Sequence, residues 1–160
     1  MESESGGSDT DDQRLYVGRV FHSSKEAVYA VQDHALSLKK SVRVARRSGT
    51  DRRLECSSAA CTMFVQCYRR STVVGGKRAW GNWYLSSLDL NHVNCLTGPK
   101  PTGRQIAAME TVTSAVHAKR DLPAKALIEL VQERDKVSLK KKKRTVYRAI
   151  EAINEEDKAA

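Results

Sequence analysis

The chain has 160 residues, enough for one ordinary domain or two small ones. Lys and Arg number 28 against 19 Asp and Glu, and residues 1–12 hold five of the acids and no base, so the remainder carries a net charge of +14. A polyanion is the expected partner, with nucleic acid ahead of an anionic membrane surface. The longest uncharged stretch, 56–68, is 13 residues and too short to span a bilayer, and the acidic N-terminus lacks the apolar segment of a signal peptide. We expect neither membrane insertion nor secretion.

The N-terminal part predicts an acidic tail and then a domain over residues 14–97. Residues 1–13 are Ser, Gly and acid rich and are expected to be disordered. A short strand-like run at 15–21 follows. Ser23 and Glu26 stand three apart, which is the spacing of a capping box and predicts the start of an amphipathic helix.

After this helix the hydrophobic period changes to two, which is typical of half-buried strands. Glycine and polar residues between the alternating runs predict tight turns. The expected strands are, in chain order, 42–44, 53–56, 61–69 and 80–90, with turns at 48–51 and 74–77. Together they predict an α+β fold with a small antiparallel four-stranded sheet and one preceding helix.

Gly98-Pro99-Lys100-Pro101 predicts a domain boundary, with a linker over 98–103. Apolar residues then repeat at helical spacing, and short connections predict a three-helix unit over 104–155 with a tail at 156–160. Its last two helices have the outline of a helix-turn-helix, although any helical hairpin shares that outline.

The cysteines and one histidine form the most informative pattern in the sequence. Cys56-x4-Cys61 is followed, after thirty residues, by His92-x2-Cys95. Structural zinc takes four tetrahedral nitrogen or sulfur ligands, usually as two close pairs. Antiparallel pairing of the two strands between the pairs would bring both pairs to the same end of the sheet. The pattern therefore predicts one Zn²⁺ per chain. The alternative is four structural cysteines buried in the core.

The remaining cysteine and histidines fit other roles better. Cys67 shares a strand face with Met63 and Val65, which favours a core thiol over a ligand. His22, His34 and His117 have no partner at ligand spacing and are expected outside the metal site.

These residues resemble a known family. The run Val17-Gly18-Arg19-Val20-Phe21, the helix that Ser23 and Glu26 open, Cys56-x4-Cys61, Trp83 and His92-x2-Cys95 look like the N-terminal zinc-finger region of Mutator-like transposases. The plant far-red-impaired-response regulators are similar, and both belong to the WRKY–GCM zinc-finger superfamily. Val146-Tyr147-Arg148-Ala149 resembles the aromatic-Arg-Ala motif that follows the finger in those transposases. The gap between the ligand pairs is longer here than in the family, which predicts an extended hairpin around Gly75 and Gly76. The fourth ligand is Cys where WRKY proteins have His.

The resemblance implies sequence-specific binding of duplex DNA by a sheet edge in the major groove. The reading strand of the family precedes the first zinc cysteine, and 41–47 matches that place. The residues carried over are Lys40, Arg43, Arg46 and Arg47. The heptapeptide of the family is missing, so the resemblance names no base sequence.

The basic residues favour DNA binding independently of the resemblance. Seven positive charges lie within 39–53, and a two-stranded ribbon fits the major groove, where arginine reads guanine. The alternative is a solvated hairpin face. The seven are Lys39, Lys40, Arg43, Arg46, Arg47, Arg52 and Arg53, of which all but Lys39 are our DNA-binding candidates.

A second basic run, formed by Lys140, Lys141, Lys142, Lys143 and Arg144, lies at the start of the last predicted helix. Cations at a helix N-terminus oppose the helix dipole, so we expect a nuclear-localisation signal or a phosphate contact. Trp80, Trp83 and Tyr84 can stack on bases, but for Trp83 a place in the core is favoured.

Taken together, the sequence predicts a nuclear, zinc-dependent DNA-binding module of a transposase-derived protein or transcription regulator. Protein partners would engage the helical unit, and no small-molecule substrate is expected. The alternative is a zinc-stapled module whose basic face binds protein or RNA. A catalytic transposase would need an acidic metal triad that the chain does not offer, so we expect no enzyme activity.

Overall fold

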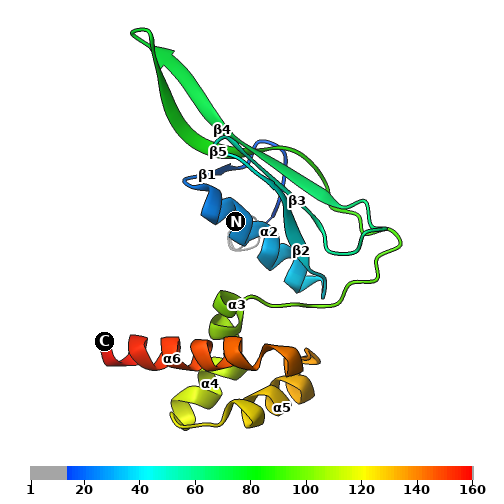
Figure 1. Cartoon of the computed structure of the whole chain (residues 1–160), viewed down its shortest axis with the longest axis vertical. Helices are drawn as coiled ribbons and strands as arrows, with labels where there is room; N and C mark the ends of the chain where they lie inside the picture. Colours follow the sequence, from blue (N-terminus) through cyan, green and yellow to red (C-terminus); the bar gives the residue numbers. More distant parts are fainter. Residues whose placement is uncertain (1–13, 160) are drawn as a thin grey trace, which may run out of the picture. The chain divides into compact units, whose positions relative to one another are not determined.

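The computed structural model describes residues 14–159, and the acidic tail predicted at 1–13 lies outside the described residues. The chain divides after Gly98 into two compact units, each with its own hydrophobic core. Figure 1 shows an antiparallel sheet with one helix against it in the first unit, and helices alone in the second.

The first unit is built on a five-stranded antiparallel sheet with the order β1-β5-β4-β3-β2. β2, β3 and β4 each pair with the next strand along the chain, whereas β1 pairs with the distant β5 and forms the other edge. The strands are β1 (Val20–Phe21), β2 (Val42–Arg47), β3 (Asp51–Cys56), β4 (Phe64–Val74) and β5 (Lys77–Asp89). The sheet therefore has one strand more than the sequence predicted, because the run at 15–21 contributes β1.

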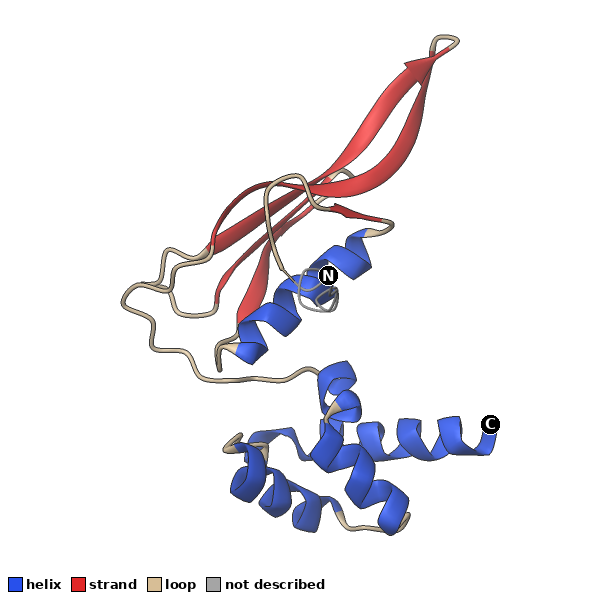
Figure 2. Cartoon of the chain, turned by 180° about the vertical axis from the view of Figure 1, so that it is seen from behind, coloured by secondary structure: helices blue, strands red, loops and turns tan. Residues whose placement is uncertain are grey.

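Helix α2 (Ser24–Ser37) lies against one face of this sheet (Figure 2). Ser23 is its N-cap, and the Ser23 hydroxyl accepts a hydrogen bond from the Glu26 amide at 3.1 Å. The Glu26 carboxylate accepts in turn from the His22 amide at 2.9 Å. The first bond satisfies a backbone donor that the first turn of a helix leaves unpaired, and the second ties the residue before the N-cap to that turn. The predicted start of the helix is confirmed.

The core of the first unit lies between α2 and the sheet. Small side chains of α2, including Ala27 and Val31, allow close approach to the strands, where Leu54, Val65 and Leu85 are fully buried. Cys67 is also fully buried in this core, and Trp83 is 5% exposed, so both predicted core residues are confirmed. The opposite face of the sheet carries no helix (Figure 2).

Strands β4 and β5 continue well beyond their neighbours. β3 pairs with β4 no further than Tyr68, and β1 pairs with β5 only at Trp83 and Tyr84. The remaining hairpin, residues 69–82, has no third strand, and we call it the arm. Gly75 and Gly76 turn it with φ of +59° and +78°, a left-handed conformation that glycine adopts without the Cβ penalty. Figure 1 shows the arm projecting past the rest of the sheet.

The second unit consists of helices whose apolar faces meet in one core. Ile106, Val112, Leu127 and Val146 are fully buried there. Its elements are α3 (Gly103–Ala108), α4 (Glu110–Ala118), α5 (Ala124–Asp135), the 3₁₀ turn η1 (Lys140–Lys142) and α6 (Lys143–Ala159).

This arrangement differs in three respects from the predicted three-helix unit. Met109, with ψ of 131°, interrupts the first predicted helix and separates α3 from α4. A capping box at Thr102 and Gln105 starts α3 within the predicted linker. Helix α6 continues to Ala159, so the residues predicted as a tail after 155 are helical as far as the structure describes them.

Candidate metal centre

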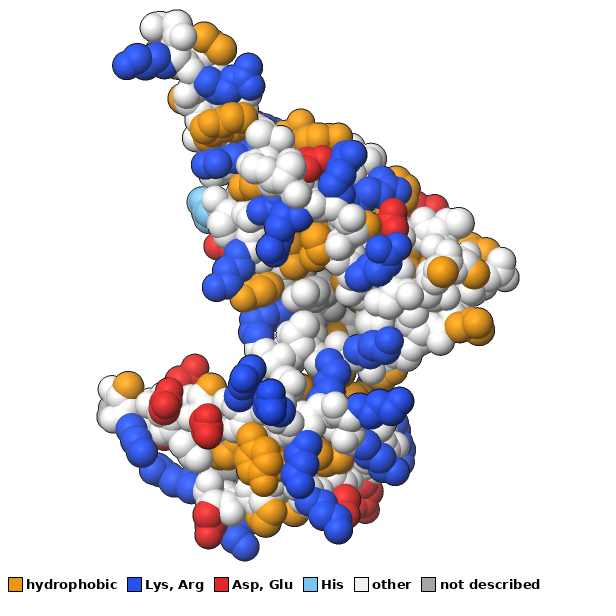
Figure 3. Space-filling view, viewed as in Figure 1, with side chains coloured by type: hydrophobic (Ala, Val, Ile, Leu, Met, Phe, Trp, Pro, Cys, Tyr) orange, Lys and Arg blue, Asp and Glu red, His pale blue; other side chains and the backbone are white. Residues whose placement is uncertain are grey.

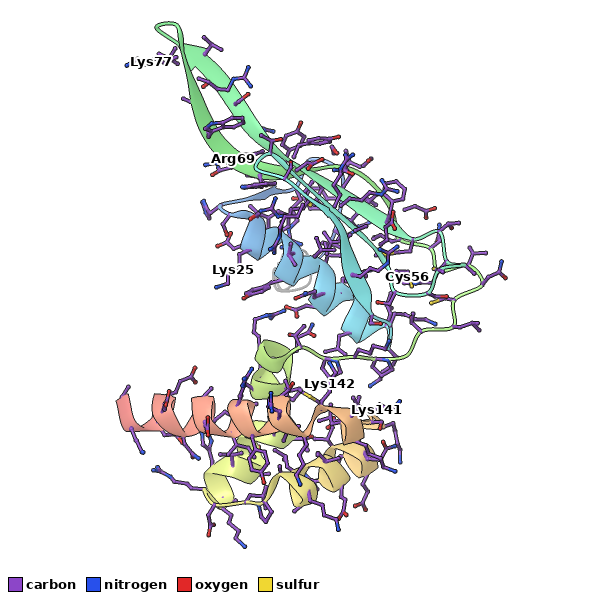
Figure 4. All side chains as sticks on the ribbon, viewed as in Figure 1. Lys25, Cys56, Arg69, Lys77, Lys141 and Lys142 are labelled. Atoms are coloured by element: carbon purple, nitrogen blue, oxygen red, sulfur yellow. The ribbon has the colours of Figure 1, made fainter. Side chains whose placement is uncertain are left out.

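The three cysteines and the histidine of the predicted site meet at one end of the sheet. Cys56 is the last residue of β3, and Cys61 lies in the connection to β4. His92 and Cys95 follow the end of β5. Because β3 and β5 both run antiparallel to β4, they end at the same end of the sheet, where Glu55, Phe64 and Asp89 lie in register. Figure 4 labels Cys56 at this end of the sheet.

The four ligand atoms, three Sγ and one imidazole nitrogen, lie within 4.8 Å of one another. Cys56 Sγ is 3.4 Å from Cys95 Sγ, and Cys61 Sγ is 3.4 Å from His92 Nδ1. In a tetrahedral site with zinc bond lengths of about 2.0–2.3 Å, ligand atoms are separated by roughly 3.5–3.8 Å. The two separations are slightly shorter than this and none exceeds 4.8 Å, so small side-chain adjustments would let this cluster hold one metal ion.

Thr97 adds a neighbouring hydroxyl that the sequence reasoning missed. Its Oγ1 lies 3.1 Å from Cys95 Sγ and 3.7 Å from Cys56 Sγ. The hydrogen bond from Thr97 lowers the pKa of the Cys95 thiol to about 5, whereas burial raises the pKa of the Cys56 thiol. Thiolate is the metal-binding form of cysteine, and hydrogen bonds to ligand atoms commonly orient metal ligands. In the sequence, this contact could have been predicted from a threonine two residues after Cys95.

The surroundings of His92 also fit a metal ligand. Its Nε2 is buried and has no hydrogen-bond partner among the described residues, while its Nδ1 faces the Cys61 sulfur. Imidazole has one donor and one acceptor nitrogen when neutral, and a metal on Nδ1 would fix the proton on Nε2. His22, His34 and His117 are outside the cluster, as predicted.

The six DNA-binding candidates lie on or beside the β2–β3 hairpin, at the free edge of the sheet. Arg43 and Arg46 are exposed and form ion pairs with Glu55 and Asp51, both at 2.8 Å. Exposed ion pairs such as Arg43–Glu55 contribute about 0–1 kcal/mol, so a phosphate can compete for Arg43. The Asp51 side chain is only 10% exposed, so removing Arg46 from it is more costly. Lys40 precedes β2 and is half-buried.

Arg52 and Arg53 have roles within the unit. The Arg52 guanidinium lies 5.0 Å from the centroid of the Trp83 ring and donates to the backbone carbonyls of Ser48 and Asp51. Arg53 bonds the Glu55 carboxylate at 2.8 Å. Both arginines are half-buried, so their charge is partly committed to holding the hairpin.

A β-bulge in β2 changes which arginines share a face. Val44 pairs with Leu54 and Arg46 with Arg53, so Ala45 is the extra residue. Strict alternation along β2 would place Ala45 on the same face as Arg43. The bulge places Arg46 there instead, on the face without the helix, and turns Arg47 to the other face.

The basic run of the second unit lies in η1 and the first turn of α6. Lys142 is half-buried and donates to the Pro101 carbonyl at 2.8 Å, and burial lowers the pKa of its amine. It therefore has a structural contact. The other members, Lys140, Lys141, Lys143 and Arg144, are exposed.

No family model, curated protein or solved structure matches this chain. None of the helices in the described part of the chain is both long and apolar enough to cross a membrane. The assignment of function therefore rests on the site and the surface.

Proposed function

We propose that this chain is a zinc-dependent module that binds duplex DNA in the nucleus, of the kind found in transposase-derived proteins and transcription regulators. The observation that carries the proposal is the cluster of Cys56, Cys61, His92 and Cys95, with ligand atoms within 4.8 Å at one end of a basic sheet. Three thiolates and one imidazole are a common donor set for structural zinc. Zinc has no redox chemistry, so its role here is to hold the two strand connections together.

The free edge of the sheet supports DNA as the partner. β2 pairs on one side only, and all of its residues after Val42 are exposed. Two arginine pairs, Arg46 with Arg53 and Arg47 with Arg52, lie directly across the hairpin. Like charges in that position destabilise a hairpin unless an anion shares them. Asp51 and Glu55 already pair with Arg46 and Arg53, whereas Arg47 and Arg52 form no ion pair among the described residues. A phosphate backbone supplies such an anion, and the strand edge is narrow enough for the major groove.

Zinc content tests the first half of the proposal. Native mass spectrometry of the reduced chain should give one zinc per wild-type molecule, and weakened or lost zinc in Cys56→Ser and in His92→Ala. Cys67→Ser is the matched control, because Cys67 is a buried thiol outside the cluster. A folded wild-type chain that binds no zinc would contradict the proposal.

DNA binding tests the second half. Selection from a random duplex library should yield a preferred site that the zinc-loaded chain binds better than random DNA. Arg43→Ala with Arg47→Ala should reduce this preference without loss of zinc, whereas the exposed pair Arg120→Ala with Arg134→Ala removes the same charge far along the sequence and should leave the preference unchanged. Equal affinity for all duplexes, or tighter binding of RNA, would contradict it.

A further inference from the structure

The arm, residues 69–82, differs from the rest of the first unit because it has no core. Every residue in it is exposed, and neither β1 nor β3 extends along it. An isolated two-stranded hairpin is only marginally stable in water. The six residues from Arg69 to Val74 span about 20 Å at 3.4 Å per residue. A ribbon of this length with both faces in solvent has no structural role in the fold, so a partner is the better explanation of its length.

The charge of the arm defines the chemistry of that partner. It contains Arg69, Arg70, Lys77 and Arg78 and no Asp or Glu. None of the four cations forms an ion pair within the described part of the chain. Figure 4 labels Arg69 at the base of the arm and Lys77 near its tip, so positive charge runs along its whole length. On the face seen in Figure 3 the arm carries basic and apolar side chains and no acidic one.

Aromatic rings hold three of these cations in place. The guanidinium groups of Arg69 and Arg78 lie 5.5 and 5.6 Å from the centroid of the Trp80 ring. Arg70 lies 5.3 Å from the centroid of the Tyr84 ring. Stacking on a ring restricts an arginine side chain but leaves its N–H edge free to donate to an anion. The arm therefore presents pre-positioned donors at intervals along a ribbon, which suits a regular array of phosphates better than a single carboxylate.

We propose that the arm is a second DNA-binding element, which follows the sugar–phosphate backbone of the duplex that β2 contacts. The choice of duplex DNA as partner rests on the proposed function, but the residues are separate from β2 and from the metal cluster. Contacts of this kind position a protein on DNA without reading bases. The exposed Val73 and Val74 give the tip apolar contacts for deoxyribose, since each is 68% exposed.

Salt dependence measures how many phosphates the arm contacts. Four contacts would contribute a slope of about 3.6 to the fall of log affinity with log salt, which is roughly 150-fold between 50 and 200 mM. Lys77→Gln with Arg78→Gln removes two of them without touching the core. The loss of affinity for DNA between 50 and 200 mM salt should then be about 12-fold smaller than in wild type. The control, Lys119→Gln with Lys125→Gln, removes two exposed charges of the second unit and should leave the slope unchanged.

Tryptophan fluorescence locates the contact independently. The chain has two tryptophans, of which Trp80 is 42% exposed and Trp83 only 5%, so acrylamide quenches mainly Trp80. Addition of a duplex should protect this signal, and Trp80→Phe should remove the protected component. A slope that is the same in the Lys77/Arg78 variant and in wild type, or a Trp80 that stays open to acrylamide in the complex, would overturn the arm's role.

Two further outcomes separate this inference from its alternatives. If Arg43→Ala with Arg47→Ala leaves binding intact while the Lys77/Arg78 variant loses slope, the arm binds DNA and the assignment to β2 fails. Trp80 already shielded in a chain that sediments as a dimer without DNA would overturn the inference and make the arm a contact between copies.

Discussion

Removal of the metal should unfold the first unit and leave the second folded. The four proposed ligands lie in or beside connections that few other contacts hold, among them the hydrogen bond from the Leu96 amide to Ser58 Oγ. The core beneath is small, because α2 contributes two alanines and one valine as its buried residues. Structural zinc contributes on the order of 10–16 kcal/mol in finger peptides, against a typical domain stability of about 5–15 kcal/mol. Metal-free, this unit should not fold at 25 °C.

Two optical signals distinguish the units in a chelation experiment. Both tryptophans lie in the first unit, so their emission should shift to the red as Trp83 leaves the core. The helices of the second unit contain 6, 9, 12 and 17 residues against 14 in α2, so about three quarters of the helical circular dichroism should remain.

Readdition of zinc should restore the tryptophan signal. Unchanged tryptophan emission after complete chelation would refute the reasoning, because it would mean that the sheet folds without the metal. Loss of all helical signal together with the sheet would refute the independence of the two cores.

Three further changes test particular contacts. Leu127→Ala should destabilise only the second unit, by about 2–5 kcal/mol, because Leu127 is fully buried there; its helical melt should move while tryptophan emission does not. Ser23→Ala should cost the first unit about 0.5–2 kcal/mol by removing the N-cap of α2, and an unchanged denaturant midpoint would argue against that cap. Burial raises the pKa of the Cys67 thiol to about 11 from 9.0, so the unfolded chain loses this proton first and stability should fall by about 1.4 kcal/mol per pH unit between pH 9 and 11. Titration of unfolding in Cys67→Ala should lack this slope, and an identical slope would contradict the raised pKa.

The sequence predicted those parts of the fold that short-range patterns determine. The Ser23 cap, the alternation that buries Val65 and Cys67, and the Gly75–Gly76 turn all follow from neighbouring residues. The ligand cluster was predictable for a similar reason, since close pairs at strand ends need only antiparallel pairing to meet. The strand-like run at 15–21 was predicted, but not that part of it joins the sheet as β1, because this depends on pairing with Trp83 and Tyr84 far along the chain.

Irregular features escaped prediction because no local pattern encodes them. The bulge at Ala45 is a property of how β2 and β3 pair, so the faces of Arg46 and Arg47 could not be read from alternation. Met109 interrupts the helix although it is neither proline nor glycine, so residue type does not predict the break. The arm was anticipated only as a long hairpin. Its four cations form two pairs separated by six uncharged residues, so they make no basic run in the sequence and come together only through the hairpin.

The metal cluster and the arm lie at opposite ends of the same two strands. β4 begins and β5 ends beside the ligands, while the turn at Gly75 and Gly76 is the far end of both. Residues can therefore be added to or removed from the hairpin in opposed pairs without displacing Cys61 or His92. The thirty-residue spacing between the two ligand pairs thus records the length of a projecting hairpin, and imposes nothing on the metal geometry. Chains with a far shorter spacing can share this metal site and this sheet, and the length of the hairpin beyond the sheet can differ among them.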